Sequence, residues 1–253
     1  MSIITLLLIL FIGLFILLGA ILGYTFKKNN KIADFSISTA FGVIMTFIAI
    51  SLIPDILEIS LEYLGIGKGV LISSILAFLG FIILQQLDLF IPHHEEKNKH
   101  HNHKCYDEHL KHIGIITSIV LIIHNIINGM NLYIITNSSI KIGLLSGFGI
   151  GLQNISMGLL ITSAFINTLD KKKTIIISLI ISFFTFLGGL ITFISGLDSE
   201  LIMCLLFAVS LGMFVYIGFC ELLELVFKME DKNSKFMGVA AGIIIVIISV
   251  IFG

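Results

Sequence analysis

Two short stretches of the chain carry closely related sets of polar side chains inside long apolar runs. Residues 124–129 read HNIING and residues 153–158 read QNISMG. Residues four apart share one face of a helix, so His124 pairs with Asn128, and Gln153 pairs with Met157. A polar side chain at bilayer depth is costly unless it is paired or bound to something. The pattern therefore predicts a buried ligand site formed by His124, Asn125, Asn128, Gln153, Asn154 and Met157.

The composition indicates an integral membrane protein. Hydrophobic residues make up 57% of the 253 residues, charged residues 12%, and the mean hydropathy is +1.10. These values exclude a soluble globular domain. The net charge of −1 offers no basis for binding nucleic acid, and the three cysteines form no disulfide pattern. No covalent catalyst or nucleotide-binding loop is recognisable, so an enzyme is not expected.

Eight apolar runs are long enough to cross a membrane, which takes about 20 residues each. We expect an all-α bundle in which the first run is a retained span rather than a cleaved signal peptide. The whole chain would form one polytopic domain, residues 1–253. The predicted spans are residues 2–26, 35–60, 69–92, 113–136, 140–168, 174–196, 199–227 and 235–252.

Lysine placement predicts the orientation of these spans. All fifteen basic residues are lysine, and all but Lys68 and Lys141 lie in the loops after the first, third, fifth and seventh spans. Because basic loops stay on the cytoplasmic side, these loops should be cytoplasmic and both termini outside.

The longest connection, residues 93–112, contains seven of the eight histidines. Clustered imidazoles beside a thiol suit Zn²⁺ and similar ions, although the same composition is also that of a solvated linker. The predicted ligands in this cytoplasmic loop are His93, His94, His100, His101, His103, Cys105, His109 and His112.

Acidic residues also occur near the ends of two spans. Asp55 and Glu58 follow Pro54 in the second span, and Glu221 and Glu224 share a face of the seventh. The matching pairs are similar to halves of an internal inverted repeat, which is frequent in secondary transporters. We expect all four to line an ion pathway, although acids near helix ends can also reach headgroup water. Asp88, near the end of the third span, is expected at that interface.

Together these features resemble the ZIP family of divalent metal transporters. In its bacterial branch the fourth and fifth helices carry His-Asn-x-Pro-Glu-Gly and Gln-Asn/Asp-x-Pro-Glu-Gly, which the stretches at 124–129 and 153–158 resemble. Residues 42–55 resemble the second helix of the family, residues 212–224 the seventh. The resemblance covers nearly the whole chain and implies a secondary carrier that moves Zn²⁺, or Fe²⁺, Mn²⁺ or Cd²⁺, towards the cytoplasm through a site between helices four and five. It also adds Met45 as a candidate ligand.

The chain departs from the family at its bridging glutamates. Asn128 and Met157 stand where the motifs have glutamate, and residues 185–188 (TFLG) replace Glu-Pro-x-Gly in the sixth helix. A two-metal site is then untenable, and a single, softer site remains. The expected partners are the transported metal ion and the lipid bilayer of the plasma membrane, with no permanent cofactor and a homodimer left open. The alternative is a degenerate relative that binds metal as a sensor or structural partner without transport.

Overall fold

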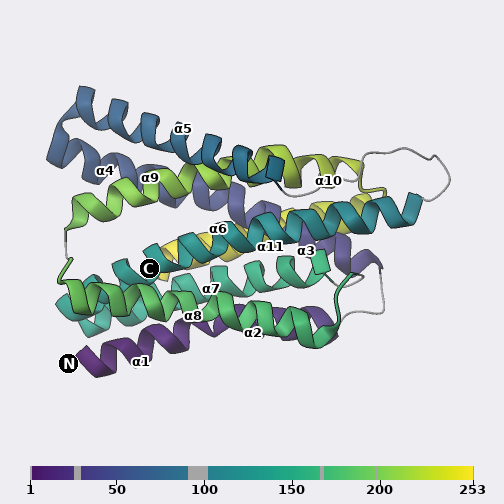
Figure 1. Ribbon diagram of the computed structural model, residues 1–253, viewed down its shortest axis with the longest axis horizontal. Helices are drawn as coiled ribbons and strands as arrows, with labels where there is room; N and C mark the ends of the chain where they lie inside the picture. Colours follow the sequence, from purple (N-terminus) through teal and green to yellow (C-terminus); the bar gives the residue numbers. More distant parts are fainter. Residues whose placement is uncertain (1, 26–29, 91–101, 166–167, 198, 253) are drawn as a thin grey trace.

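The computed structural model describes residues 2–25, 30–90, 102–165, 168–197 and 199–252, and every regular element in these ranges is helical (Figure 1). Within these ranges eight helices are long and apolar enough to cross a membrane, which confirms the prediction of an all-α, eight-span, multi-pass membrane protein. The elements are α1 Ser2–Gly13, α2 Phe15–Thr25, α3 Asn30–Phe47, η1 Ile48–Leu52, α4 Ile53–Leu64, α5 Ile66–Phe90, α6 Asn102–Ser138, α7 Ile140–Phe165, α8 Lys171–Ser195, α9 Glu200–Tyr216, η2 Ile217–Leu222, α10 Leu223–Lys228 and α11 Lys232–Phe252.

Glycine and serine residues stand at several helix ends, where the backbone must turn or needs a cap. Gly65 alone joins α4 to α5, with a φ of 77° that glycine adopts without steric cost. Gly196 ends α8 in the left-handed conformation, and its N–H closes the last turn on the carbonyl of Thr192. The hydroxyl of Ser199 accepts a bond from the N–H of Ile202 and so caps the start of α9.

The second and seventh spans each contain one π-helical segment. Segment η1 separates α3 from α4, and η2 separates α9 from α10. Such wide turns rotate the side chains that follow them, and they occur often at functional sites. Their matching positions in spans two and seven support the internal symmetry expected from the paired acids. In both spans the acids lie in or just beyond the wide turn.

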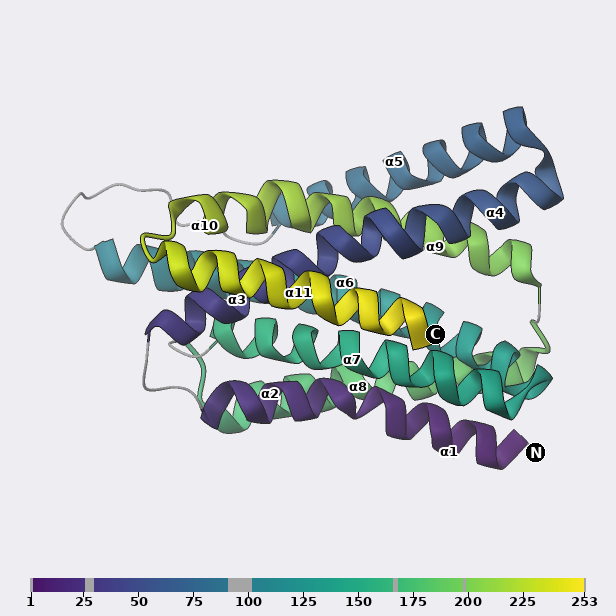
Figure 2. The same cartoon turned by 180° about the vertical axis from the view of Figure 1, so that it is seen from behind.

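Helix α6 lies in the middle of the bundle, against α1, α7, α8 and α9. Helix α5 packs chiefly on α9, and α11 packs chiefly on α3. Both views show the two termini at one end of the bundle and the start of α6 at the opposite end (Figures 1 and 2).

Glycine allows α6 and α8 to touch backbone to backbone. A Cβ at Gly129 would overlap the carbonyl oxygen of Thr185, and a Cβ at Gly188 would overlap the carbonyl oxygen of Ile126. In lipid no hydrophobic effect drives helices together, so small residues that permit close approach support association. The glycine that ends the first polar stretch therefore has a packing role.

Helix α6 begins earlier than the sequence predicted. It is 37 residues long and starts at Asn102, so residues 102–112, expected in the loop, are helical. A helix of this length extends about 55 Å, well beyond a hydrocarbon core of about 30 Å. Hydropathy marks only the apolar part of such a helix, which explains why the polar first turns were assigned to the loop.

Candidate metal centre

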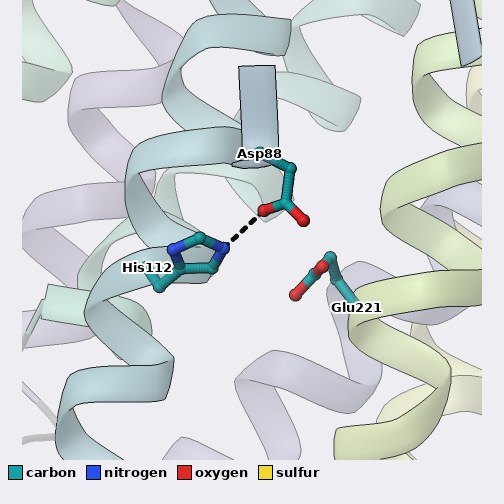
Figure 3. A group of neighbouring side chains, drawn as sticks. All are labelled: Asp88, His112 and Glu221. Carbon is teal, nitrogen blue, oxygen red and sulfur yellow. Dashed lines mark hydrogen bonds and ion pairs between the residues drawn. The ribbon is translucent and has the colours of Figure 1, made fainter. Parts of the chain in front are cut away.

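Three buried side chains of metal-ligand type meet inside the bundle (Figure 3). Asp88 comes from the last turns of α5, His112 from α6 and Glu221 from η2. One ligand atom from each residue lies within 4.8 Å of the other two. Their exposed fractions are 7%, 6% and 7%, so helices rather than water enclose them. In the part of the chain that the structure describes, this is the one such cluster of His, Cys, Asp and Glu.

Asp88 connects two neighbouring helices, because each of its carboxylate oxygens is hydrogen-bonded to a different side chain. Oδ1 lies 2.5 Å from Nε2 of His112, and Oδ2 accepts a bond of 2.6 Å from the hydroxyl of Tyr216. The ring of Tyr216 is held edge-on against Phe81 of α5, with the ring centroids 5.3 Å apart. Hydrogen bonds to a carboxylate are strong, and they offset part of the cost of taking its charge out of water. Asp88 is therefore an oriented, buried acid.

The wide turn η2 explains how Tyr216 and Glu221 both reach this centre. In an α-helix, residues five apart lie roughly 140° apart around the axis, since each residue turns about 100°. In a π-helical turn the hydrogen bonds run from residue i to i+5, so residues five apart follow one another along one face. The carboxylate of Glu221 accordingly points towards Asp88 and His112 (Figure 3).

One imidazole and two carboxylates form a ligand set that suits Zn²⁺ and related divalent ions. The two acids supply the negative charge that a dication needs away from water. Three protein ligands leave the fourth position of a tetrahedral ion open, whereas structural zinc sites are closed by four. The centre can thus hold an ion and still exchange it.

The imidazole of His124 lies elsewhere in the bundle and is bonded through both ring nitrogens. Nδ1 is 3.1 Å from the hydroxyl of Ser210 on α9, and Nε2 is 2.9 Å from Nδ2 of Asn128. Phe214 and Phe47 stand edge-on to the ring, with centroids 4.7 and 5.7 Å from that of the imidazole. The predicted pairing of His124 and Asn128 on one face is present.

The remaining predicted central ligands make contacts with several different elements. Gln153 donates from Nε2 to Ser249 of α11 at 2.8 Å, and Asn154 donates from Nδ2 to the carbonyl of Ile12 in α1 at 3.5 Å. Asn125 is fully buried, and neither atom of its amide has a hydrogen-bond partner among the described residues.

The two methionines of the predicted shell have different recorded contacts. Met157 belongs to the main hydrophobic core, and Sδ of half-buried Met45 lies against Gly218 in η2. A shared metal shell of these residues with His124 stays a prediction.

The acids predicted to line a pathway differ in their surroundings. Glu221 is buried in the metal centre, whereas Glu224 is exposed and paired with Lys228 at 2.5 Å. Asp55 is exposed and accepts a bond of 3.2 Å from Ser51, and Glu58 is also exposed. Exposure near a helix end agrees with the interfacial alternative, and a pathway role for these three acids stays a prediction.

Two sequence-based assignments were wrong. His112 is not a loop residue but a buried residue of α6, and Asp88 is buried rather than interfacial. The two side chains are hydrogen-bonded to each other although 24 residues separate them in the chain, and no local sequence pattern shows such a contact. The available signal was an isolated acid inside the third span and a histidine at the start of the fourth. The other predicted loop ligands, His93, His94, His100, His101, His103, Cys105 and His109, lie outside the residues whose side chains are described.

Comparison with known proteins gives one consistent relationship. The family described as ZIP Zinc transporter matches residues 92–249. A protein named zinc transporter ZupT from Enterobacter sp. (strain 638) is 24% identical over 97% of this chain and 95% of its own length. The ZupT of Oceanobacillus iheyensis is 25% identical over 97% and 96%, and that of Clostridium perfringens is 24% identical over 97% and 94%. The match therefore extends over the complete bundle, including the metal centre.

Proposed function

This chain belongs to the ZIP zinc transporter family, a family of carriers rather than enzymes, and on that premise we propose that it carries divalent transition-metal ions into the cytoplasm. Zn²⁺ is the first expected substrate, because the curated relatives are named zinc transporters. Fe²⁺, Mn²⁺ and Cd²⁺ are further candidates that accept the same nitrogen and oxygen ligands. The observation that carries the proposal is the buried centre of Asp88, His112 and Glu221.

The position of the centre supports a role late in the path. Asp88 lies in the last turns of α5, and the lysine-containing stretch that follows α5 in the sequence is expected to face the cytoplasm. An ion arriving there would replace the hydrogen bond between His112 and Asp88 and gain both carboxylates. Leaving would restore that bond. Because this bond re-forms on release, the imidazole of His112 regains a partner when the ion leaves, which favours exchange over permanent binding.

Zinc uptake into lipid vesicles that contain the purified protein tests the proposal. Asp88→Asn keeps the side-chain shape but removes the charge, and we expect uptake to fall by at least roughly tenfold, as with altered metal ligation elsewhere. Asp170→Asn is the matched control, because this acid is 81% exposed and only loosely paired with Lys173 at 3.7 Å. Equal uptake by wild type and Asp88→Asn would overturn the role of the centre.

The alternative function is a metal sensor or structural partner without transport. The hydrogen bonds on both nitrogens of His124 favour it, because they leave that imidazole no free ligand atom. This alternative predicts zinc binding that depends on His112 together with no uptake above protein-free vesicles.

We further propose a homodimer, which the mass of the protein in detergent by light scattering would test.

A further inference from the structure

The contact between Asn128 and His124 determines which ring nitrogen of the imidazole carries the proton. Nδ2 of Asn128 is an amide nitrogen, which donates hydrogen bonds and does not accept them. At 2.9 Å from Nε2 of His124, it places its hydrogen on the lone pair of that nitrogen. Nδ1 then carries the ring proton and donates it to the hydroxyl of Ser210, 3.1 Å away. The imidazole is neutral, and its one lone pair is in use.

The same lone pair is the one a metal ion would need. A neutral imidazole binds metal through its unprotonated nitrogen while the other nitrogen donates to a fixed partner. Ser210 provides that partner here, so the ring is held in the form that ligates through Nε2. Asn128 occupies the ligand position itself.

The residue that follows His124 on α6 also has buried polar atoms without hydrogen-bond partners. Asn125, the next residue of α6, is 0% exposed, and both its amide oxygen and its amide nitrogen lack hydrogen-bond partners among the described residues. A buried polar group that is left unpaired costs free energy and calls for an explanation, such as an ion bound in another state. Phe214 and Phe47 stand edge-on to the ring of His124, so aromatic side chains shield the imidazole.

We propose that Asn128 is a cap on the metal-ligating nitrogen of His124, and that a metal ion reaches this nitrogen only when the Asn128 amide turns away. The inference rests on the proposed function and adds an affinity-determining residue to it. The site at His124 is capped and has no carboxylate, so it binds a dication weakly. The centre at Asp88 and Glu221 offers two carboxylates and binds it more strongly. His124 and His112 are twelve residues apart on α6, about 18 Å along its axis. The cap thus favours movement of the metal ion from the weak site at His124 to the charged centre at Asp88.

The test follows the ring nitrogens of His124 directly, so that zinc on the loop histidines does not interfere. The full-length protein, with ¹⁵N-labelled histidine, is titrated with Zn²⁺ in detergent, and the His124 signals are those lost in His124→Ala. In the zinc-free protein we expect Nδ1 to be protonated and Nε2 to be an acceptor. In Asn128→Ala we expect half-saturation of the His124 signal at about tenfold lower zinc, the equivalent of about 1.4 kcal/mol.

Two further variants make the result interpretable. Asn128→Leu keeps the branched shape of the side chain without a donor, so it should show the same shift even if Asn128→Ala packs poorly. Asn137→Ala, at an exposed position on the same helix, should titrate like the wild type. A proton on Nε2 in the zinc-free protein, or one zinc midpoint for wild type and both Asn128 variants, would overturn the cap. Zinc uptake that depends on Asp88 can persist in either case, so failure of the cap and failure of the proposed function are distinguishable.

Discussion

The hydroxyl of Tyr216 allows a sharp test of how the metal centre is organised. Tyr216→Phe removes one oxygen atom and with it the 2.6 Å bond to Oδ2 of Asp88, while the ring can keep its edge contact with Phe81. A hydrogen bond to a charged group contributes about 1.5–3 kcal/mol. At about 1.4 kcal/mol per tenfold, its loss corresponds to a change of roughly tenfold to a hundredfold in zinc affinity. Partners that orient metal ligands elsewhere have effects of this size.

The assay is the zinc concentration that gives half-maximal uptake into vesicles. We expect this concentration to rise by roughly tenfold to a hundredfold in Tyr216→Phe, because Asp88 is then free to turn away from the ion. Tyr133→Phe is the matched control: Tyr133 is also buried in the bundle, and its ring packs near Phe193 rather than at the centre. A half-maximal concentration within twofold of wild type in Tyr216→Phe would refute the orienting role.

Three further predictions concern stability, measured as the thermal midpoint in detergent. Gly129→Ala should lower it clearly, because the new methyl group overlaps the α8 backbone, whereas Gly67→Ala has open space and should not. Ser249→Ala should cost about 1–3 kcal/mol by leaving the buried amide of Gln153 unpaired. Glu224→Gln should change the midpoint little, since exposed ion pairs contribute about 0–1 kcal/mol. A Gly129→Ala protein as stable as Gly67→Ala would contradict the backbone contact between α6 and α8.

The sequence was sufficient for the spans because apolar length is a strong and local signal. Each of the eight predicted runs corresponds to a helix of the described structure, with ends shifted by a few residues in most cases. The exception is the start of α6, where a polar stretch rich in histidine is helical although its hydropathy is that of a loop. Hydropathy reports where a helix enters the membrane, and it carries no information on how far the helix continues beyond it.

The metal centre was only partly predictable, for two physical reasons. Glu221 was selected as a pathway acid, but an α-helical period placed it on one face with Glu224, whereas the wide turn of η2 places it on one face with Tyr216. Asp88 and His112 are buried because they neutralise each other across two helices, and a tertiary contact of that kind leaves no periodic trace in the sequence. The residue types alone showed which side chains could bind metal. Which of these side chains meet could be seen only in the folded structure.

The central claim is that an ion occupies the space between Asp88, His112 and Glu221. Crystals of the zinc-loaded protein, measured at the zinc absorption edge, test it most directly, because anomalous scattering locates zinc independently of the surrounding atoms. We predict an anomalous peak within about 2.0–2.2 Å of Nε2 of His112 and of a carboxylate oxygen of each acid. Zinc bound elsewhere in the chain, with the bond between His112 and Asp88 intact, would contradict the account.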